Sequence, residues 1–103
     1  MIARFLQLNN ELEGSVFLFG ARQTGKSTFL EAQFPNATYI DLLDAKARRR
    51  FRAKPELLYE MLQDKPEGSI VVIDEIPEVP ELLNEVHRLI QKKGLRFVLC
   101  GSS

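Results

Sequence analysis

The segment 20–27, which reads GARQTGKS, constrains the fold of this chain more than any other stretch. It matches the phosphate-binding pattern G-x-x-x-x-G-K-[ST] at every fixed position. The apolar run VFLF at 16–19 comes directly before it, and a helical pattern beginning TFL at 28–30 comes directly after it. Small residues allow a loop to turn successive backbone N–H groups inward, and the following helix contributes its positive end. The segment therefore predicts a strand–loop–helix unit that binds a polyphosphate.

The rest of the chain alternates between strand and helix patterns. Besides the strand at 16–19, apolar runs predict strands at 37–40, 69–73 and 96–100. Periodic apolar residues predict helices at 56–64 and 80–93. The phosphate-binding motif predicts a helix that opens at Gly25 and runs to about residue 33, and Asp44 as a cap predicts a helix at 45–53. Strands without polar alternation are typical of a parallel sheet that is covered on both faces. Alternating strands and helices therefore predict an α/β fold, with three layers (α/β/α) and a mostly parallel sheet.

Several helix ends carry recognisable boundary residues. Asp44 precedes the helix at 45–53 and has the short polar side chain of an N-cap. Pro55 and Pro80 suit the first turns of the last two helices. Gly94 follows Lys92 and Lys93, as expected for a residue that ends a helix in the left-handed conformation.

Composition and charge exclude several classes of protein. The chain has 103 residues, which predicts a single domain, and its 14 Lys and Arg residues balance 14 Asp and Glu residues. This balance does not indicate nucleic acid or a membrane surface, and we interpret the basic run between Lys46 and Lys54 as a solvated helix face. A lone cysteine, Cys100, is expected in the core and suits the reducing cytosol. The sequence shows neither a membrane span nor a signal peptide, so we predict a cytoplasmic protein.

The residue types in two motifs predict magnesium-dependent nucleotide chemistry. Lys26 is expected to bridge the β- and γ-phosphate oxygens, and Ser27 to offer its hydroxyl group to Mg²⁺. The strand predicted at 69–73 is followed directly by Asp74, which we assign to Mg²⁺, and by Glu75, which is placed to orient or deprotonate the attacking water. The nucleotide-binding residues are predicted to be the loop and the start of its helix: Gly20, Ala21, Arg22, Gln23, Thr24, Gly25, Lys26, Ser27 and Thr28.

Further polar residues follow the predicted strands. Ser102 and Ser103 come after the last strand, where a hydroxyl group could contact the γ-phosphate or the attacking water, so we count both as catalytic candidates. Asp41 ends the second strand at the edge where α/β folds bind ligands, but a turn or cap role is the favoured interpretation. His87 lies among charged neighbours and is interpreted as a surface residue.

Four stretches resemble the N-terminal portion of a prokaryotic AAA+ ATPase family: FLFGARQTGKSTFL, YIDLLD, IVVIDEIPEVPELLNEVHRLI and RFVLCGSS. The resemblance covers about residues 15–103. It implies the P-loop NTPase fold with a parallel sheet ordered 5-1-4-3-2, a catalytic role for Glu75, and a sensor role for Ser102 or Ser103. Pro77 stands where a Gln is common, a departure with little consequence for nucleotide binding.

The resemblance also implies parts that follow the fourth strand in the family. These are a fifth strand, a helical lid, an arginine that completes a neighbour's site, and a nuclease-like C-terminal domain. We therefore expect residues 1–103 to form one partial AAA+ core, truncated after the fourth strand. Its first strand is then an apolar sheet edge, which predicts self-association.

The functional hypothesis is binding of ATP or ADP with Mg²⁺ and weak ATP hydrolysis, because the cation that accelerates hydrolysis in such enzymes comes from outside the core. A non-catalytic module that binds nucleotide or a protein partner is the main alternative. A small P-loop kinase is a further alternative, although the Asp74–Glu75 pair favours water as the acceptor.

Overall fold

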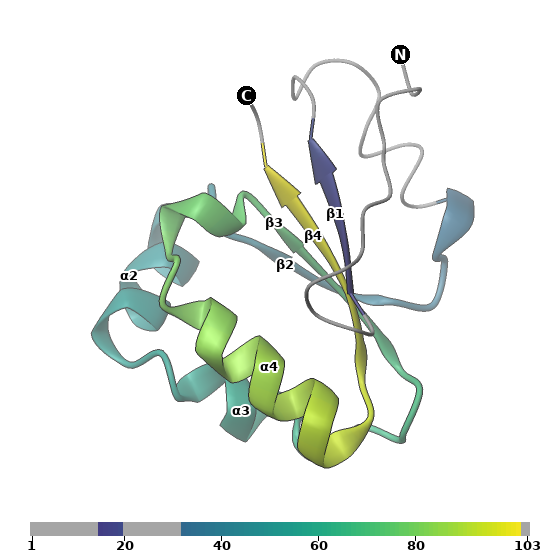
Figure 1. Cartoon of the computed structure of the whole chain (residues 1–103). Helices are drawn as coiled ribbons and strands as arrows, with labels where there is room; N and C mark the ends of the chain where they lie inside the picture. Colours follow the sequence, from purple (N-terminus) through teal and green to yellow (C-terminus); the bar gives the residue numbers. More distant parts are fainter. Residues whose placement is uncertain (1–14, 20–31, 102–103) are drawn as a thin grey trace.

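A computed structural model describes residues 15–19 and 32–101, and these form an α/β fold around a four-stranded parallel sheet (Figure 1). The strands are β1 (Ser15–Phe19), β2 (Thr38–Asp41), β3 (Ile70–Asp74) and β4 (Arg96–Gly101). Their order across the sheet is β1-β4-β3-β2, and each neighbouring pair is parallel. This confirms the predicted α/β class, the parallel sheet and the 1-4-3-2 part of the expected strand order.

The helices lie close to their predicted positions. They are α2 (Ala45–Ala53), α3 (Leu57–Leu62) and α4 (Leu82–Lys93), with a short 3-10 helix, η2 (Ile76–Glu78), between β3 and α4. The prediction of a helix over 56–64 was too long at both ends. The prediction that Pro80 opens the last helix was wrong by two residues, because the amides of residues 82–84 bond to carbonyl groups three residues earlier, as in a 3-10 turn. Gly94 ends α4 with φ 69°, as predicted.

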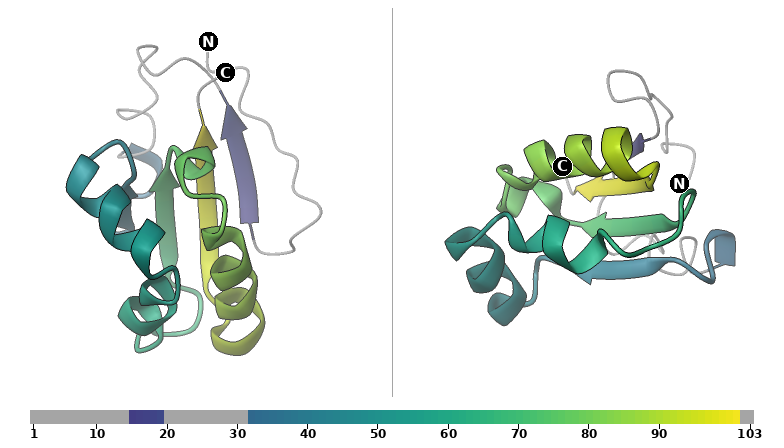
Figure 2. Two further views of the ribbon diagram at one scale, coloured as in Figure 1. Left: turned by 90° about the vertical axis from the view of Figure 1, so that its left-hand side faces the viewer. Right: turned by 90° about the horizontal axis from the view of Figure 1, so that it is seen from below.

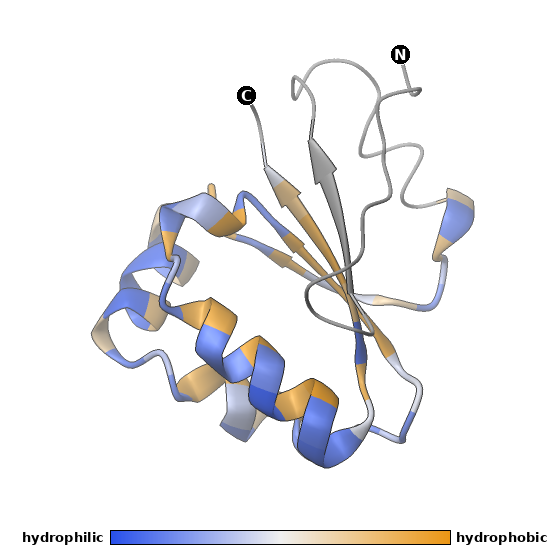
Figure 3. Cartoon of the chain, viewed as in Figure 1, coloured by the Kyte–Doolittle hydropathy of each residue, from blue (hydrophilic) through white to orange (hydrophobic). Residues whose placement is uncertain are grey.

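Helices α2, α3 and α4 cover one face of the sheet (Figure 2). The core between them is the larger of two apolar clusters, and α4 turns its apolar side toward it (Figure 3). The strands contribute every second residue to this larger cluster, among them Val71, Ile73, Phe97 and Leu99. A period of two places such side chains on one face, which explains why the helices pack there.

The opposite face of the sheet holds a smaller cluster of Val72, Val98 and Cys100, against which Phe34 and Ile70 pack. Cys100 is fully buried, which confirms its predicted place in the core. The structure describes only residues 32–33 of the helix predicted at 25–33. They are helical and lie on the opposite side of the sheet from α2–α4 (Figure 1). The remainder of that helix lies outside the described residues. No helix in the described ranges is long and apolar enough to cross a membrane.

Asp44 caps α2 as predicted. Its carboxylate oxygen Oδ2 accepts a hydrogen bond of 3.0 Å from the amide of Ala47, and its own backbone is extended. This bond satisfies one of the helix's first amides, which have no carbonyl partner within the helix.

Replacing Asp44 with Ala is expected to lower the free energy of unfolding by about 1 kcal/mol, because the capped amide loses its acceptor. Asp44→Asn retains a side-chain oxygen acceptor and serves as the matched control, with little expected change. Urea unfolding followed by circular dichroism measures both variants. An equal loss in the two would show that charge, and not the capping bond, stabilises the start of α2.

Candidate functional site

The carboxyl ends of all four strands meet at one edge of the sheet, because every neighbouring pair is parallel. At this edge Phe19 of β1 lies beside Gly101 of β4, and Asp41 of β2 lies beside Asp74 of β3. Open parallel sheets bind ligands outside the carboxyl ends of their strands. The edge therefore brings together the residues that end or follow each strand.

Asp74 ends the most deeply buried part of the sheet. The three residues before it, Val71, Val72 and Ile73, are fully buried, whereas Asp74 is half-buried. Its backbone carbonyl accepts a hydrogen bond of 3.0 Å from the amide of Leu42, which extends the contact with the chain after β2. Pairing with β2 and the bond from Leu42 fix the backbone of Asp74 at the sheet edge, where the sequence predicted this residue.

Glu75 follows in a conformation that the sequence did not reveal. Its φ of 62° and ψ of 46° are left-handed, and among the described non-glycine residues it is alone in having a positive φ. Glu75 is buried, with 6% of the residue exposed. A left-handed non-glycine residue costs about 1 kcal/mol or more, and such strain clusters at functional sites. The chain therefore leaves the extended path of β3 at Glu75.

Asp41 has a local structural role. Its Oδ1 accepts a hydrogen bond of 2.9 Å from the amide of Leu43, two residues on, which forms an Asx turn at the end of β2. This confirms the favoured interpretation of Asp41 as a turn residue.

The phosphate-binding segment and the terminal serines lie outside the described residues. These are the predicted nucleotide-binding residues Gly20 to Thr28, with Lys26 and Ser27 among them, and the catalytic candidates Ser102 and Ser103. The described strands end directly before both segments in the sequence. β1 ends at Phe19, one residue before the motif, and β4 ends at Gly101, one residue before Ser102, both at the edge that holds Asp74.

A family model described as "AAA domain" matches residues 13–103. The chain belongs to this AAA domain family. Neither the curated proteins nor the solved structures include a significant match to the chain. Membership agrees with the parallel α/β sheet and indicates an AAA-type P-loop domain that binds nucleotide.

The side chains at this sheet edge of the AAA domain suit Mg²⁺ better than a metal ion whose ligands all come from protein. Within the described ranges no group of three or more His, Cys, Asp or Glu residues could hold a metal ion. Magnesium is usually bound through one or two carboxylates together with substrate phosphates and waters. Asp74, a half-buried carboxylate, meets that requirement, because it lies at the same sheet edge as the end of β1, which leads into the phosphate-binding motif, with β4 between the two strands.

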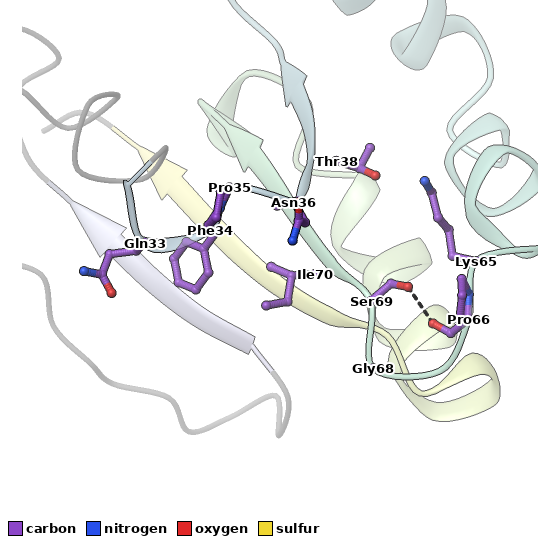
Figure 4. A pocket seen from close by; sticks show the side chains of 11 residues that line it. Gln33, Phe34, Pro35, Asn36, Thr38, Lys65, Pro66, Gly68, Ser69 and Ile70 are labelled. Carbon is purple, nitrogen blue, oxygen red and sulfur yellow. Dashed lines mark hydrogen bonds between the residues drawn. The ribbon is translucent and has the colours of Figure 1, made fainter.

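A cavity of about 400 Å³ lies at the other end of the sheet (Figure 4). Phe34 and Ile70 supply apolar walls, and its rim includes Thr38 at the start of β2 and Ser69 just before β3. Ser69 donates a hydrogen bond of 2.7 Å to the carbonyl group of Pro66. Because this cavity adjoins the amino ends of β2 and β3, it is separate from the edge that carries Asp74 in this AAA domain.

The basic side chains on α2 differ in their surroundings: some are exposed to solvent, and others make specific contacts. Lys46, Arg49 and Arg50 are exposed, in agreement with a solvated helix face, and His87 on α4 is exposed as predicted. Arg52 differs, because its guanidinium group donates to Glu78 in η2. Sequence reasoning missed this contact. The two residues are 26 positions apart, and no local pattern pairs them.

Proposed function

We propose that this AAA domain binds ATP or ADP together with Mg²⁺ and hydrolyses ATP slowly. Lys26 neutralises the β- and γ-phosphates, while the backbone amides between Gly20 and Thr28 surround the phosphate oxygens. Ser27 and Asp74 hold the magnesium ion. Magnesium supplies charge neutralisation between the phosphates, and the protein residues position it.

Glu75 orients the attacking water and accepts its proton. In this proposal its buried side chain is held within a tight turn next to Asp74, which suits a base that must face a bound nucleotide and not bulk water. A hydroxyl group of Ser102 or Ser103 contacts the γ-phosphate or that water.

One observation carries the proposal. The end of β1, which leads into the GKS motif, and Asp74–Glu75 at the end of β3 lie on the same edge, with β4 between them. Neighbouring strands are about 5 Å apart, so β1 and β3 are separated by about 10 Å. A magnesium-bound triphosphate is long enough to connect groups at that separation.

Calorimetric titration with ATP, ADP and GTP, each with and without Mg²⁺, tests the proposal directly. We expect binding of ATP and ADP that strengthens with Mg²⁺, and weaker binding of GTP. Absence of measurable binding to any of the three nucleotides contradicts the proposal. Phosphate release by the same preparation is expected to stay well below 1 s⁻¹, because a cation supplied from outside the core raises the rate of related enzymes by about 10³–10⁵.

We also propose that the chain associates with a second copy through β1. In the described sheet β1 pairs with β4 on one side, and its sequence, SVFLF, is apolar. An apolar edge strand presents unpaired backbone groups and favours pairing with another chain. Light scattering at micromolar concentration is expected to give a mass above 11.8 kDa, the mass of one chain. A strictly monomeric mass contradicts this.

A further inference from the structure

The guanidinium group of Arg52 joins α2 to η2, the 3-10 helix that follows Asp74 and Glu75. Its Nε and Nη2 donate to the backbone carbonyl of Glu78, at 3.2 Å and 3.0 Å. Nη2 also lies 3.4 Å from the Glu78 carboxylate oxygen Oε1. Two donors on one carbonyl hold the end of η2 in a defined place relative to α2.

The same turn is coupled to Glu75. The amide of Glu78 donates to the carbonyl of Glu75 at 2.9 Å, and the amide of Val79 donates to the carbonyl of Ile76 at 3.0 Å. Glu75 therefore occupies the first position of a hydrogen-bonded turn whose last residue is bound by Arg52. Its left-handed conformation is unfavourable alone and requires support from its surroundings.

We propose that Arg52 is a positioning residue that maintains the conformation of Glu75 by fixing η2. This rests on the proposed function, in which Glu75 acts on the attacking water. Arg52 itself is half-exposed on α2 and acts through the Glu78 carbonyl, so it contributes to hydrolysis and not to nucleotide affinity.

Arg52→Gln tests the proposal, with Lys54→Gln as a matched control. Lys54 lies one residue after α2 and forms an ion pair of 3.2 Å with Glu60, and its side chain is 55% exposed against 54% for Arg52. Both variants remove one positive charge and one exposed ion pair, whose loss has little effect on stability. Only Arg52→Gln releases η2.

The first measurement is amide hydrogen exchange in the full chain. Arg52→Gln is expected to accelerate exchange at Glu78 and Val79 by about tenfold, because a local turn opens more often when its anchor is removed. Amides in α4 should keep their wild-type rates, and Lys54→Gln should leave η2 unchanged. Unchanged exchange at the amides of both Glu78 and Val79 in Arg52→Gln overturns the proposal, whether or not the protein hydrolyses ATP.

The second measurement is ATP hydrolysis with the affinity for ATP determined in parallel. Arg52→Gln is expected to lower kcat by about tenfold with KM and Kd unchanged, since small displacements of a catalytic group reduce the rate strongly. Arg52→Lys, which retains the charge without the planar pair of donors, should recover part of the rate. Equal kcat values in Arg52→Gln and wild type overturn the positioning role. Failure of the wild-type protein to bind ATP contradicts the proposed function instead.

Discussion

Replacing Lys26 with Ala is expected to raise the Kd for ATP by about 100-fold. The ammonium group is predicted to make two charge-assisted hydrogen bonds to phosphate oxygens, each worth about 1.5–3 kcal/mol. Losing about 3 kcal/mol corresponds to roughly two orders of magnitude in Kd. The effect should be smaller for ADP, which lacks the γ-phosphate, and smallest for AMP, which lacks both the β- and the γ-phosphate. Calorimetric titration in the presence of Mg²⁺ measures all three affinities.

Lys46→Ala provides the matched control for this substitution. Lys46 lies on the exposed side of α2, and its removal changes the net charge by the same amount. A purely long-range electrostatic contribution would lower ATP affinity in both variants and would decrease with added salt. We expect Lys46→Ala to bind ATP like the wild type. Wild-type affinity in Lys26→Ala would rule out the GKS motif as the phosphate site of this AAA domain.

The position of Asp74 at the sheet edge could be predicted from the sequence for a simple reason. A run of four apolar residues, all of them β-branched, makes a buried strand, and the first charged residues after it must lie where the strand leaves the core. Parallel strands then share that edge. The strand ends, the Asp44 cap and the Gly94 helix end all depend on such local preferences, and the structure confirms them.

The geometry around Glu75 could not be predicted in the same way. The left-handed conformation of Glu75 and the 3-10 helix after it depend on contacts made elsewhere in the fold, and no local pattern indicates them. Arg52 contributes to these contacts from α2, and in sequence it was indistinguishable from the exposed arginines beside it. A hydrogen bond between a side chain and a distant backbone carbonyl leaves no periodic pattern in the sequence. Residues that make such bonds, like Arg52, can therefore be identified only once the fold is known.

Replacing Glu75 with Gln is the second change with a large expected effect. The amide has nearly the same size as the carboxylate and retains hydrogen-bonding capacity, but it cannot accept a proton from water. We expect ATP hydrolysis to fall by about 100-fold or more, the usual range for removal of a general base. The Kd for ATP should stay near its wild-type value, because Glu75 is not assigned to the phosphates or to Mg²⁺. Single-turnover hydrolysis and calorimetric titration of the same preparation measure the two quantities.

Glu81→Gln is the control for this variant, because it makes the same chemical change at an exposed position six residues further along the chain. It should leave both hydrolysis and binding unchanged. Thermal unfolding of Glu75→Gln must also be measured, since Glu75 is buried and a folding defect would lower every activity together. If a well-folded Glu75→Gln variant hydrolyses ATP as fast as the wild type, Glu75 is not the base. The buried left-handed turn at the end of β3 would then be a structural feature, and hydrolysis would depend on a different residue.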